Sequence, residues 1–204
     1  MWCFALFLLY FGGEGAKNMR NSELLKLLED FPVIAAVQED KFQAALASPV
    51  DVIFSLEPHL LTIGERTRQA HDAGKVLFVH LAMAAGIEQD REGLQFLANC
   101  GVDGIISTKG HIIRMARELG LLTVQRFFAL DSQGVSMIQD TLKTNLPHFI
   151  EIMPGVIPKI IKQFSSGPVP VIAGGLIETR QEVNAALSNG ALAISTGCKV
   201  LWEE

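Results

Sequence analysis

Two short segments rich in glycine and hydroxyl groups are candidates for holding a phosphate group. Gly174 and Gly175 follow an apolar run, and Ser195, Thr196 and Gly197 form the second segment. Glycine lets backbone N–H groups approach an anion closely, and the hydroxyls of serine and threonine are further hydrogen-bond donors. Together the two segments predict a site for a small phosphorylated molecule. Tight turns are the alternative interpretation of either segment alone.

Charged and titratable side chains within or beside apolar segments form a second set of candidates. Glu151 lies between two isoleucines, and Arg126 lies in the run Gln-Arg-Phe-Phe. Because a buried charge without a partner is costly, we expect Arg126 and Glu151 to pair across neighbouring strands, as ligand contacts or as a structural ion pair. His80 and Lys109, at the ends of two other apolar segments, complete a polar mouth. A core histidine and a solvated lysine are the alternatives for these two.

Beyond residue 31 the chain alternates short β-rich apolar segments with polar segments of helical periodicity. The predicted strands are residues 33–37, 51–56, 76–81, 104–108, 123–130, 149–154, 169–175 and 191–197. The predicted helices between them are residues 41–47, 63–73, 91–99, 111–119, 135–146, 156–164 and 180–188.

Eight strands are the number that closes a parallel barrel, so we predict an α/β fold, a compact TIM-type (β/α)8 barrel. Its last helix is truncated, because only residues 198–204 follow the last strand. A doubly wound open sheet is the alternative, but the Gly-x-Gly-x-x-Gly pattern is missing after the first strand. In such barrels the loops after strands seven and eight often bind phosphate, and the two glycine-containing segments lie there.

The first residues of the chain differ in character from the rest. Residues 2–11 are an unbroken apolar run of about half the length that a helix needs to cross a bilayer. No basic residue precedes them, as one would in a signal peptide. We expect residues 1–22 to be an N-terminal extension outside the fold, with residues 1–18 arising from an upstream start, and residues 23–204 to form one barrel domain. Ser22 is the expected N-cap of a helix over residues 23–30. A peripheral membrane tether is the alternative for the apolar run.

The composition is that of a globular chain. Hydrophobic residues make up 49% of the 204 residues and charged residues 19%, which argues against disorder. The net charge of −5 argues against a non-specific binder of polyanions. Three scattered cysteines favour neither a disulfide framework nor a zinc site, so we expect no metal and a reducing, cytoplasmic location.

Several common catalytic motifs are missing from the sequence. It contains no His-x-x-x-His pair, no Gly-x-Ser-x-Gly elbow and no P-loop. We therefore expect a chain that binds a phosphorylated molecule without transforming it. The alternative is a phosphosugar-handling enzyme of isomerase, lyase or aldolase type, in which Lys109, His80 or Glu151 performs acid–base chemistry.

Five segments resemble the glycerol-3-phosphate-responsive antiterminators, which regulate bacterial glycerol operons. These segments are GIISTK at 104–109, VQRFFALDS at 124–132, IEIMPGVIP at 150–158, IAGGLIET at 172–179 and STGCKVLW at 195–202. The likeness runs from about residue 31 to residue 202. The resemblance implies a TIM-type barrel that binds glycerol 3-phosphate as its effector. So liganded, it would act on a leader mRNA to prevent transcription termination. No cofactor is implied.

The chain departs from the family's pattern after the third predicted strand. The family usually has His-Ile-Asp-Leu and then Glu-Gly or Gln-Gly, whereas residues 80–86 are HLAMAAG. Ala82 replaces the aspartate, and Ala85 replaces the polar residue before the glycine. Gly197 and Cys198 also stand where a Ser-Asn pair is common. A barrel that has lost its ligand response is therefore a third interpretation.

An acidic protein that binds RNA needs a local basic face. Arg114 and Arg117 are spaced three residues apart on one predicted helix, with Lys109 and His111 nearby, and Lys159 and Lys162 lie on another. We name Arg114, Arg117, Lys159 and Lys162 as candidate RNA contacts; solvated helix faces are the alternative. Apolar helix faces would also permit a homo-oligomer.

Overall fold

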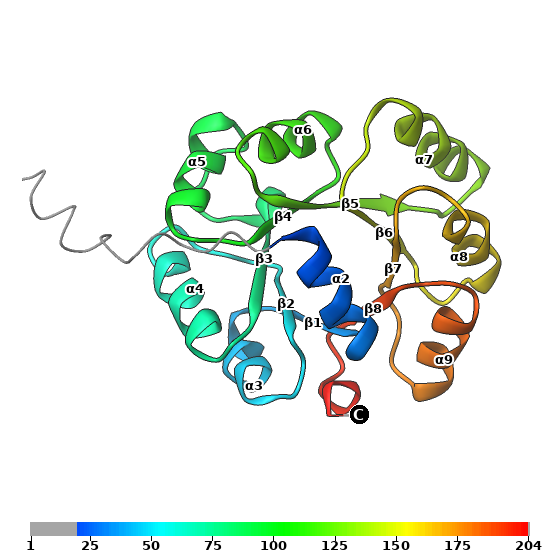
Figure 1. Cartoon of the computed structure of the whole chain (residues 1–204), viewed down its shortest axis with the longest axis horizontal. Helices are drawn as coiled ribbons and strands as arrows, with labels where there is room; N and C mark the ends of the chain where they lie inside the picture. The colour runs from blue at the N-terminus through cyan, green and yellow to red at the C-terminus, as the bar shows by residue number, and fades with distance from the viewer. Residues whose placement is uncertain (1–19, 204) are drawn as a thin grey trace, which may run out of the picture.

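The computed structural model describes residues 20–203, which form a closed barrel of parallel strands (Figure 1). Each strand pairs with the next in chain order, and the eighth pairs with the first. The strands are β1 (Val33–Val37), β2 (Val52–Ser55), β3 (Val76–His80), β4 (Gly104–Ser107), β5 (Leu122–Phe128), β6 (Phe149–Met153), β7 (Val171–Gly174) and β8 (Ala193–Thr196). The predicted TIM-type barrel is confirmed, and the open-sheet alternative is wrong.

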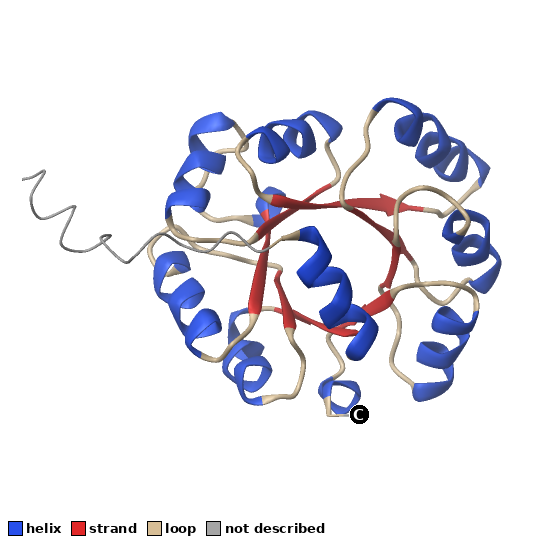
Figure 2. Ribbon diagram, in the orientation of Figure 1, coloured by secondary structure: helices blue, strands red, loops and turns tan. Residues whose placement is uncertain are grey.

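Helices surround the ring of strands, as Figure 2 shows. They are α2 (Asn21–Asp30), α3 (Phe42–Ala47), α4 (Ile63–Asp72), α5 (Arg91–Asn99), α6 (Gly110–Glu118), α7 (Ser132–Thr144), α8 (Pro158–Ser165) and α9 (Arg180–Ser188). Three 3₁₀ helices are η1 (Glu39–Lys41), η2 (Leu81–Met83) and η3 (Lys199–Trp202). Within residues 20–203 no helix combines the length and the apolar character that crossing a membrane requires.

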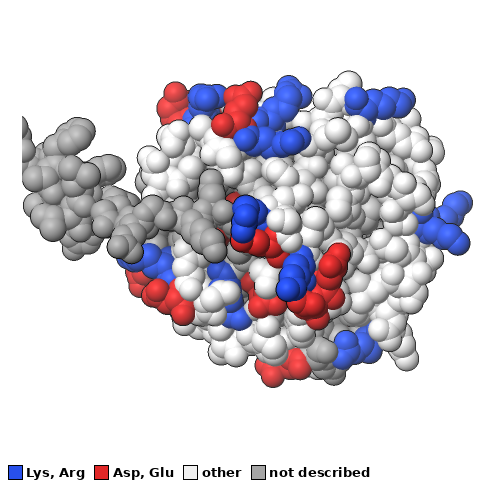
Figure 3. Space-filling view, in the orientation of Figure 1, with Lys and Arg blue, Asp and Glu red and all other residues white. Residues whose placement is uncertain are grey.

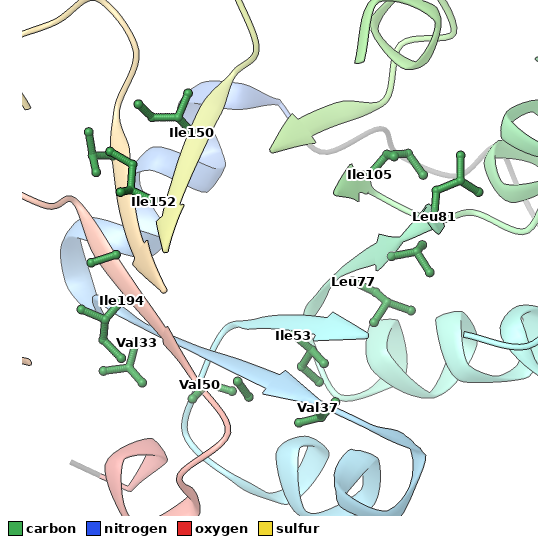
Figure 4. Packing of buried hydrophobic residues seen from close by; sticks show 14 of the residues in the cluster. Val33, Val37, Val50, Ile53, Leu77, Leu81, Ile105, Ile150, Ile152 and Ile194 are labelled. Carbon is green, nitrogen blue, oxygen red and sulfur yellow. The ribbon is translucent and has the colours of Figure 1, made fainter. Parts of the chain in front are cut away.

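Side chains along each strand alternate between the barrel interior and the layer under the helices. The interior cluster includes Ile34, Phe54, Phe78, Val124 and Ile172. The outer cluster, part of which is drawn in Figure 4, includes Val33, Ile53, Leu77, Ile105 and Ile150. Because both faces of the sheet are buried, the strands are apolar in nearly every position, which is why the sequence shows continuous rather than alternating runs.

Helix α2 closes the amino-terminal end of the barrel. Leu24 and Leu28 are buried in the interior cluster, and Figure 1 shows the helix lying across the opening. The helix begins at Asn21, so the prediction that Ser22 is its N-cap is wrong. The Glu23 carboxylate accepts a hydrogen bond from the backbone N–H of Arg20 at 3.1 Å and ties down the first turn. The extension predicted over residues 1–22 thus overlaps the helix at its end, and residues 1–19 lie outside the described part.

Helix α7 begins three residues before its predicted start at residue 135. A carboxylate oxygen of Asp131 accepts a hydrogen bond from the Gly134 N–H at 2.8 Å, which is an N-cap interaction. A Cβ atom on Gly134 would lie 2.5 Å from the carbonyl oxygen of Phe128, so the chain passes closely there. Hydrophobic periodicity does not detect such a polar first turn, and it placed the helix too late.

Among the described residues after β8, Lys199–Trp202 form the short helix η3, at the place where a truncated last helix was predicted. Trp202 is buried, and its Nε1–H donates a hydrogen bond to the carbonyl oxygen of Thr196 at 2.9 Å. This hydrogen bond holds the last residue of β8 against η3.

Candidate functional site

A cavity of 630 Å³ opens at the carboxyl ends of the strands, at the other end of the barrel from α2. Its walls come from the strands β1, β5, β6 and β8 and from the loops that follow β1, β2, β7 and β8. The lining residues are Ala36, Gln38, Lys41, Leu56, Arg126, Glu151, Met153, Gly175, Leu176, Ile177, Glu178, Ser195, Thr196, Gly197 and Cys198. The topology thus brings the segments after β7 and β8 together with the charged pair of β5 and β6, as the sequence predicted.

Glu151 is the centre of a buried hydrogen-bond network in this cavity. The Glu151 side chain is 1% exposed. The Nε–H of Arg126 donates to its Oε2 at 2.6 Å, and the Oγ–H of Ser195 donates to its Oε1 at 2.6 Å. Arg126 and Glu151 occupy directly paired positions on β5 and β6 and therefore share one face of the sheet. The predicted pairing across neighbouring strands is confirmed.

Gly174 leaves room for this network instead of lining the cavity. A Cβ atom at this position would collide with Oε1 of Glu151 and would lie 2.7 Å from Oγ of Ser195. The first glycine of the pair is therefore required by the buried carboxylate, a packing role that the sequence pattern alone does not distinguish from anion binding.

The loop after β7 has an unusual backbone. Gly175 and Leu176 both have positive φ, +77° and +61°. For a leucine this left-handed conformation costs about 1–2 kcal/mol, and such local strain is concentrated at ligand sites. The Leu176 side chain is 68% exposed at the cavity, so no burial of this side chain offsets the strain. Among the hydrogen bonds of the described residues, none uses the backbone N–H of Leu176 or of Gly197, which leaves both donors free to meet an anion.

The hydroxyl groups predicted as phosphate donors have partners within the protein. The single hydroxyl proton of Ser195 is given to Glu151, and that of Thr196 is given to the carbonyl oxygen of Ile177 at 2.6 Å. The start of α9 is also occupied, because the Glu182 carboxylate accepts the N–H groups of Glu178 and Thr179, each at 2.9 Å. Donors to a phosphate must therefore come from the backbone and from a cationic side chain.

Lys41 is such a cation, and the sequence analysis missed it. It ends η1, directly after β1, and its Nζ donates to the carbonyl oxygen of Gly197 at 3.1 Å, so the ammonium group stands beside the loop after β8. It was overlooked because it begins a segment of helical periodicity. The signal that would have found it is position: in a barrel the loop after strand one adjoins the loop after strand eight.

His80 is the last residue of β3, in alternation with Val76 and Phe78, which lie in the interior cluster. It is buried, and its Nδ1 atom has no hydrogen-bond partner. Burial, and then the neighbouring Arg126 guanidinium, lower the pKa of His80, so the imidazole is neutral near pH 7. His80 is not among the residues that line the cavity, so the structure does not place its unpaired ring nitrogen in that lining.

Lys109 and the two replacing alanines lie away from the cavity lining. Lys109 is exposed at the N-cap of α6, where its backbone N–H donates to Oγ of Ser107 at 3.1 Å. Ala82 lies in η2, and Ala85 forms a short bridge with His59. The structure therefore does not bring Lys109 into the group formed by Arg126, Glu151 and the two loops.

The four candidate RNA contacts do not form one patch. Arg114 and Arg117 lie on α6, Lys159 and Lys162 lie on α8, and α7 stands between these helices (Figure 1). Arg117 donates to the carbonyl oxygen of Leu146 and so fastens the loop before β6. On the face shown in Figure 3, which carries α2, acidic and basic side chains are intermixed.

The described residues contain no group of three or more His, Cys, Asp or Glu side chains that would hold a metal ion. Cys100 and Cys198 are free thiols, while Cys3 lies outside the described part.

Comparison with known proteins places the chain in a family. Residues 33–202 match the family described as glycerol-3-phosphate responsive antiterminator. The chain is 34% identical over 182 residues to the uncharacterized protein YgcP of Escherichia coli K12, covering 88% of this chain and 95% of YgcP.

Two solved structures of related proteins share the fold. The glycerol uptake operon antiterminator regulatory protein of Listeria monocytogenes superposes with a TM-score of 0.80 at 32% identity, covering 85% of this chain and 95% of that one. A glycerol uptake operon antiterminator-related protein of Thermotoga maritima gives a TM-score of 0.75 at 32% identity, with coverages of 83% and 96%. From its match over nearly the whole described barrel, the chain belongs to the glycerol-3-phosphate responsive antiterminator family.

Proposed function

We propose that this protein binds glycerol 3-phosphate in the barrel-mouth cavity and, so loaded, acts on the leader mRNA of glycerol-utilisation genes to prevent transcription termination. The observation that carries the proposal is the junction of Lys41 with the loops after β7 and β8, at one side of a cavity whose other side holds Arg126 and Glu151. Nascent transcripts would be met in the cytoplasm.

The phosphate group would occupy the side of the cavity near Lys41. Three donors would bind it: the ammonium group of Lys41 and the backbone N–H groups of Leu176 and Gly197. Gly175 has no side chain and allows the phosphate to approach the backbone closely. Backbone N–H groups beside a cation are a common phosphate-binding arrangement. Ser195 and Thr196 hold the loop through their own hydrogen bonds and contribute no hydroxyl proton to the ligand.

The glycerol hydroxyls would face the charged network. A carboxylate accepts hydrogen bonds from hydroxyl groups, and Glu151 has lone pairs beyond the two bonds that it accepts from Arg126 and Ser195. The guanidinium of Arg126, which lines the same cavity, is a further partner. In this orientation the dianionic phosphate lies away from the Glu151 carboxylate. The hydrogen bonds to the glycerol hydroxyls make glycerol 3-phosphate bind more tightly than phosphate alone.

Membership of a regulatory family favours a sensor over an enzyme. The alternative phosphosugar enzyme needs an acid–base residue against the ligand, and Lys109, one of its candidates, does not line the cavity. The Glu151 carboxylate is engaged by Arg126 and Ser195, and His80, like Lys109, does not line the cavity. Turnover is therefore not expected.

Calorimetric titration of the full chain with glycerol 3-phosphate tests the effector, with glycerol and inorganic phosphate as controls. We expect binding to glycerol 3-phosphate that is at least about tenfold tighter than to either control, and about tenfold weaker binding in Lys41→Gln. Absence of binding at millimolar ligand would refute the sensor and favour a barrel that has lost its response.

Transcription through the leader of the glycerol-utilisation genes tests the output. We expect readthrough of the terminator only when protein and glycerol 3-phosphate are both present. The ligand should be recovered unchanged by nuclear magnetic resonance. Consumption of glycerol 3-phosphate or of a triose or pentose phosphate would instead support the enzyme.

A further inference from the structure

A second cavity, of 270 Å³, opens on the side of the barrel between β5, α6 and α7. Its lining residues are Thr108, Gly110, Arg114, Gln125, Arg126, Phe127, Phe128, Met137, Thr141, Thr144 and Asn145. We call it the side cavity. Arg126 also lines the barrel-mouth cavity, and it is the residue that the two linings share.

The side cavity is positively charged. Its lining includes two arginines and no carboxylate, and because Arg126 is paired with Glu151, the uncompensated charge is that of Arg114. Arg114 is exposed and forms no ion pair among the described residues, and Lys109 stands at the N-cap of the same helix, also without an ion pair. In a chain of net charge −5 this is a local basic face, and an anionic occupant is electrostatically favoured there.

The other walls suit a flat, polar ring. Phe128 and Met137 are 49% and 58% exposed, which is unusual for large apolar side chains that line a concave surface. The side-chain amides of Asn145 and Gln125 are buried in the same lining. Nδ2 of Asn145 donates a hydrogen bond to Oε1 of Gln125 at 2.6 Å, and we call these two residues the amide pair. Aromatic and thioether surfaces that stack a base, amides that bond its edge, and arginines that meet its phosphate are the features with which proteins bind single-stranded RNA.

Gly110 keeps the side cavity open. A Cβ atom at this position would lie 3.4 Å from Nδ2 of Asn145 and 3.9 Å from Nη1 of Arg114, both lining residues. A side chain at residue 110 would therefore occupy the space between the amide pair and the arginine. This gives a substitution that blocks the side cavity without removing any charge.

Resting on the proposed function, we infer that the side cavity holds one unstacked nucleotide of the leader RNA and that Arg126 couples it to the effector site. Nε of Arg126 is held by Glu151, so the orientation of the guanidinium group depends on the network in the barrel mouth. An effector that contacts Glu151 and Arg126 fixes this orientation. Because Arg126 also lines the side cavity, the effector thereby fixes one wall of that cavity. The effector thereby selects the RNA-binding form of the protein.

Fluorescence anisotropy with a fluorescein-labelled leader transcript, at saturating glycerol 3-phosphate, tests the surface. We expect Gly110→Leu and Phe128→Ala to bind the transcript about tenfold or more weakly than the wild type, because a stacked base contributes about 1–3 kcal/mol. Arg114→Gln should bind it more weakly and should lower the slope of log affinity against log salt by about 1. Lys26→Gln, which removes one exposed charge from α2 at the amino-terminal end of the barrel, is the control and should change affinity less than about twofold.

Glycerol 3-phosphate titrations and thermal melting of the same variants show whether each is folded and still binds the effector. Wild-type RNA affinity for Gly110→Leu, Phe128→Ala and Arg114→Gln would overturn the side-cavity assignment and leave the proposed function standing. A wild-type protein that binds glycerol 3-phosphate but no leader transcript would refute the proposed RNA function itself.

The coupling has its own measurement. We expect glycerol 3-phosphate to raise wild-type affinity for the transcript by about fivefold or more, and Arg126→Lys at saturating effector to abolish most of that gain. Lysine keeps the charge but lacks the planar guanidinium whose Nε donates to Glu151. An undiminished gain in Arg126→Lys would overturn the coupling.

Discussion

Glu151 places its Oε1 atom in the space that a side chain on Gly174 would fill. The two residues belong to neighbouring strands, β6 and β7, and both face the barrel interior. The Glu151 carboxylate can be buried at this place only because residue 174 on β7 has no side chain.

Gly174→Ala is expected to lower the free energy of unfolding by about 2 kcal/mol or more, because the added methyl collides with Glu151 and crowds Ser195. Urea unfolding measures it. Gly64→Ala is the control: its Cβ would meet only Sγ of Cys100, at 3.8 Å, on helix α4, so stability should rise by about 0.5 kcal/mol. Equal stability of the two variants would contradict the packing role of Gly174.

Glu151→Leu should destabilise the protein by about 3–5 kcal/mol, because it leaves the Arg126 charge buried without its partner. Adding Arg126→Met should restore a large part of that loss, because the unpaired charge is then gone. A double-mutant cycle from denaturant unfolding gives the coupling energy. Strictly additive losses in the cycle would show that the ion pair does not act as a unit.

Leu176→Asn is expected to raise the free energy of unfolding by about 0.5–1 kcal/mol, because asparagine adopts positive φ more readily than leucine. The matched control is Leu61→Asn, since Leu61 is also exposed but lacks a positive φ. Stability of the control should change by less than about 0.5 kcal/mol. A rise of the same size in both variants would point to the loss of an exposed apolar side chain rather than to backbone strain.

Stability should depend on pH through His71. Its Nε2 lies 2.9 Å from Oδ2 of the buried Asp103, and the hydrogen bond to that carboxylate raises the pKa of His71. With a raised folded-state pKa, the stabilisation is complete below the unfolded pKa of about 6.5 and is lost as the pH rises through the folded value.

The difference in unfolding free energy between the wild type and His71→Gln should therefore be larger at about pH 5.5 than at about pH 9. Taking the difference removes the opposite contribution of His80 and His148, whose pKa values are lowered by burial. A difference that does not change with pH would show that the charged form of His71 gains nothing from Asp103.

The fold was predictable because the barrel imposes a strong pattern on the sequence. Strands buried on both faces must be apolar throughout, and β1, α5 and α9 have the bounds that the pattern predicts. The pairing of Arg126 with Glu151 followed from the cost of an isolated buried charge. The first argument needs only the residues of one strand, and the second needs only two neighbouring strands, so both can be made from the sequence.

The errors come from contacts that a residue pattern does not contain. Glu23 stabilises the first turn of α2 in place of Ser22, and Asp131 starts α7 early, because a cap depends on where one carboxylate points. Ser195 and Thr196 line the cavity as predicted, but their hydroxyl protons have partners on β6 and in the loop after β7, so a ligand-binding role for them stays a prediction. Lys41 was not predicted as a site residue. It lies in the site because β1 pairs with β8 in the closed barrel, which brings the loop after β1 beside the loop after β8.

In the part of the chain that the structure describes, helix α2 closes one end of the barrel and leaves the cavity open at the other. The interior between α2 and the cavity is filled by side chains, so a molecule in the cavity arrives and departs by the same route, past Leu176 and Gly197. Arrival and departure therefore share one barrier. A substitution that only narrows this entrance slows both rates by the same factor and leaves the equilibrium affinity unchanged, which makes the response time of the protein adjustable without altering its sensitivity.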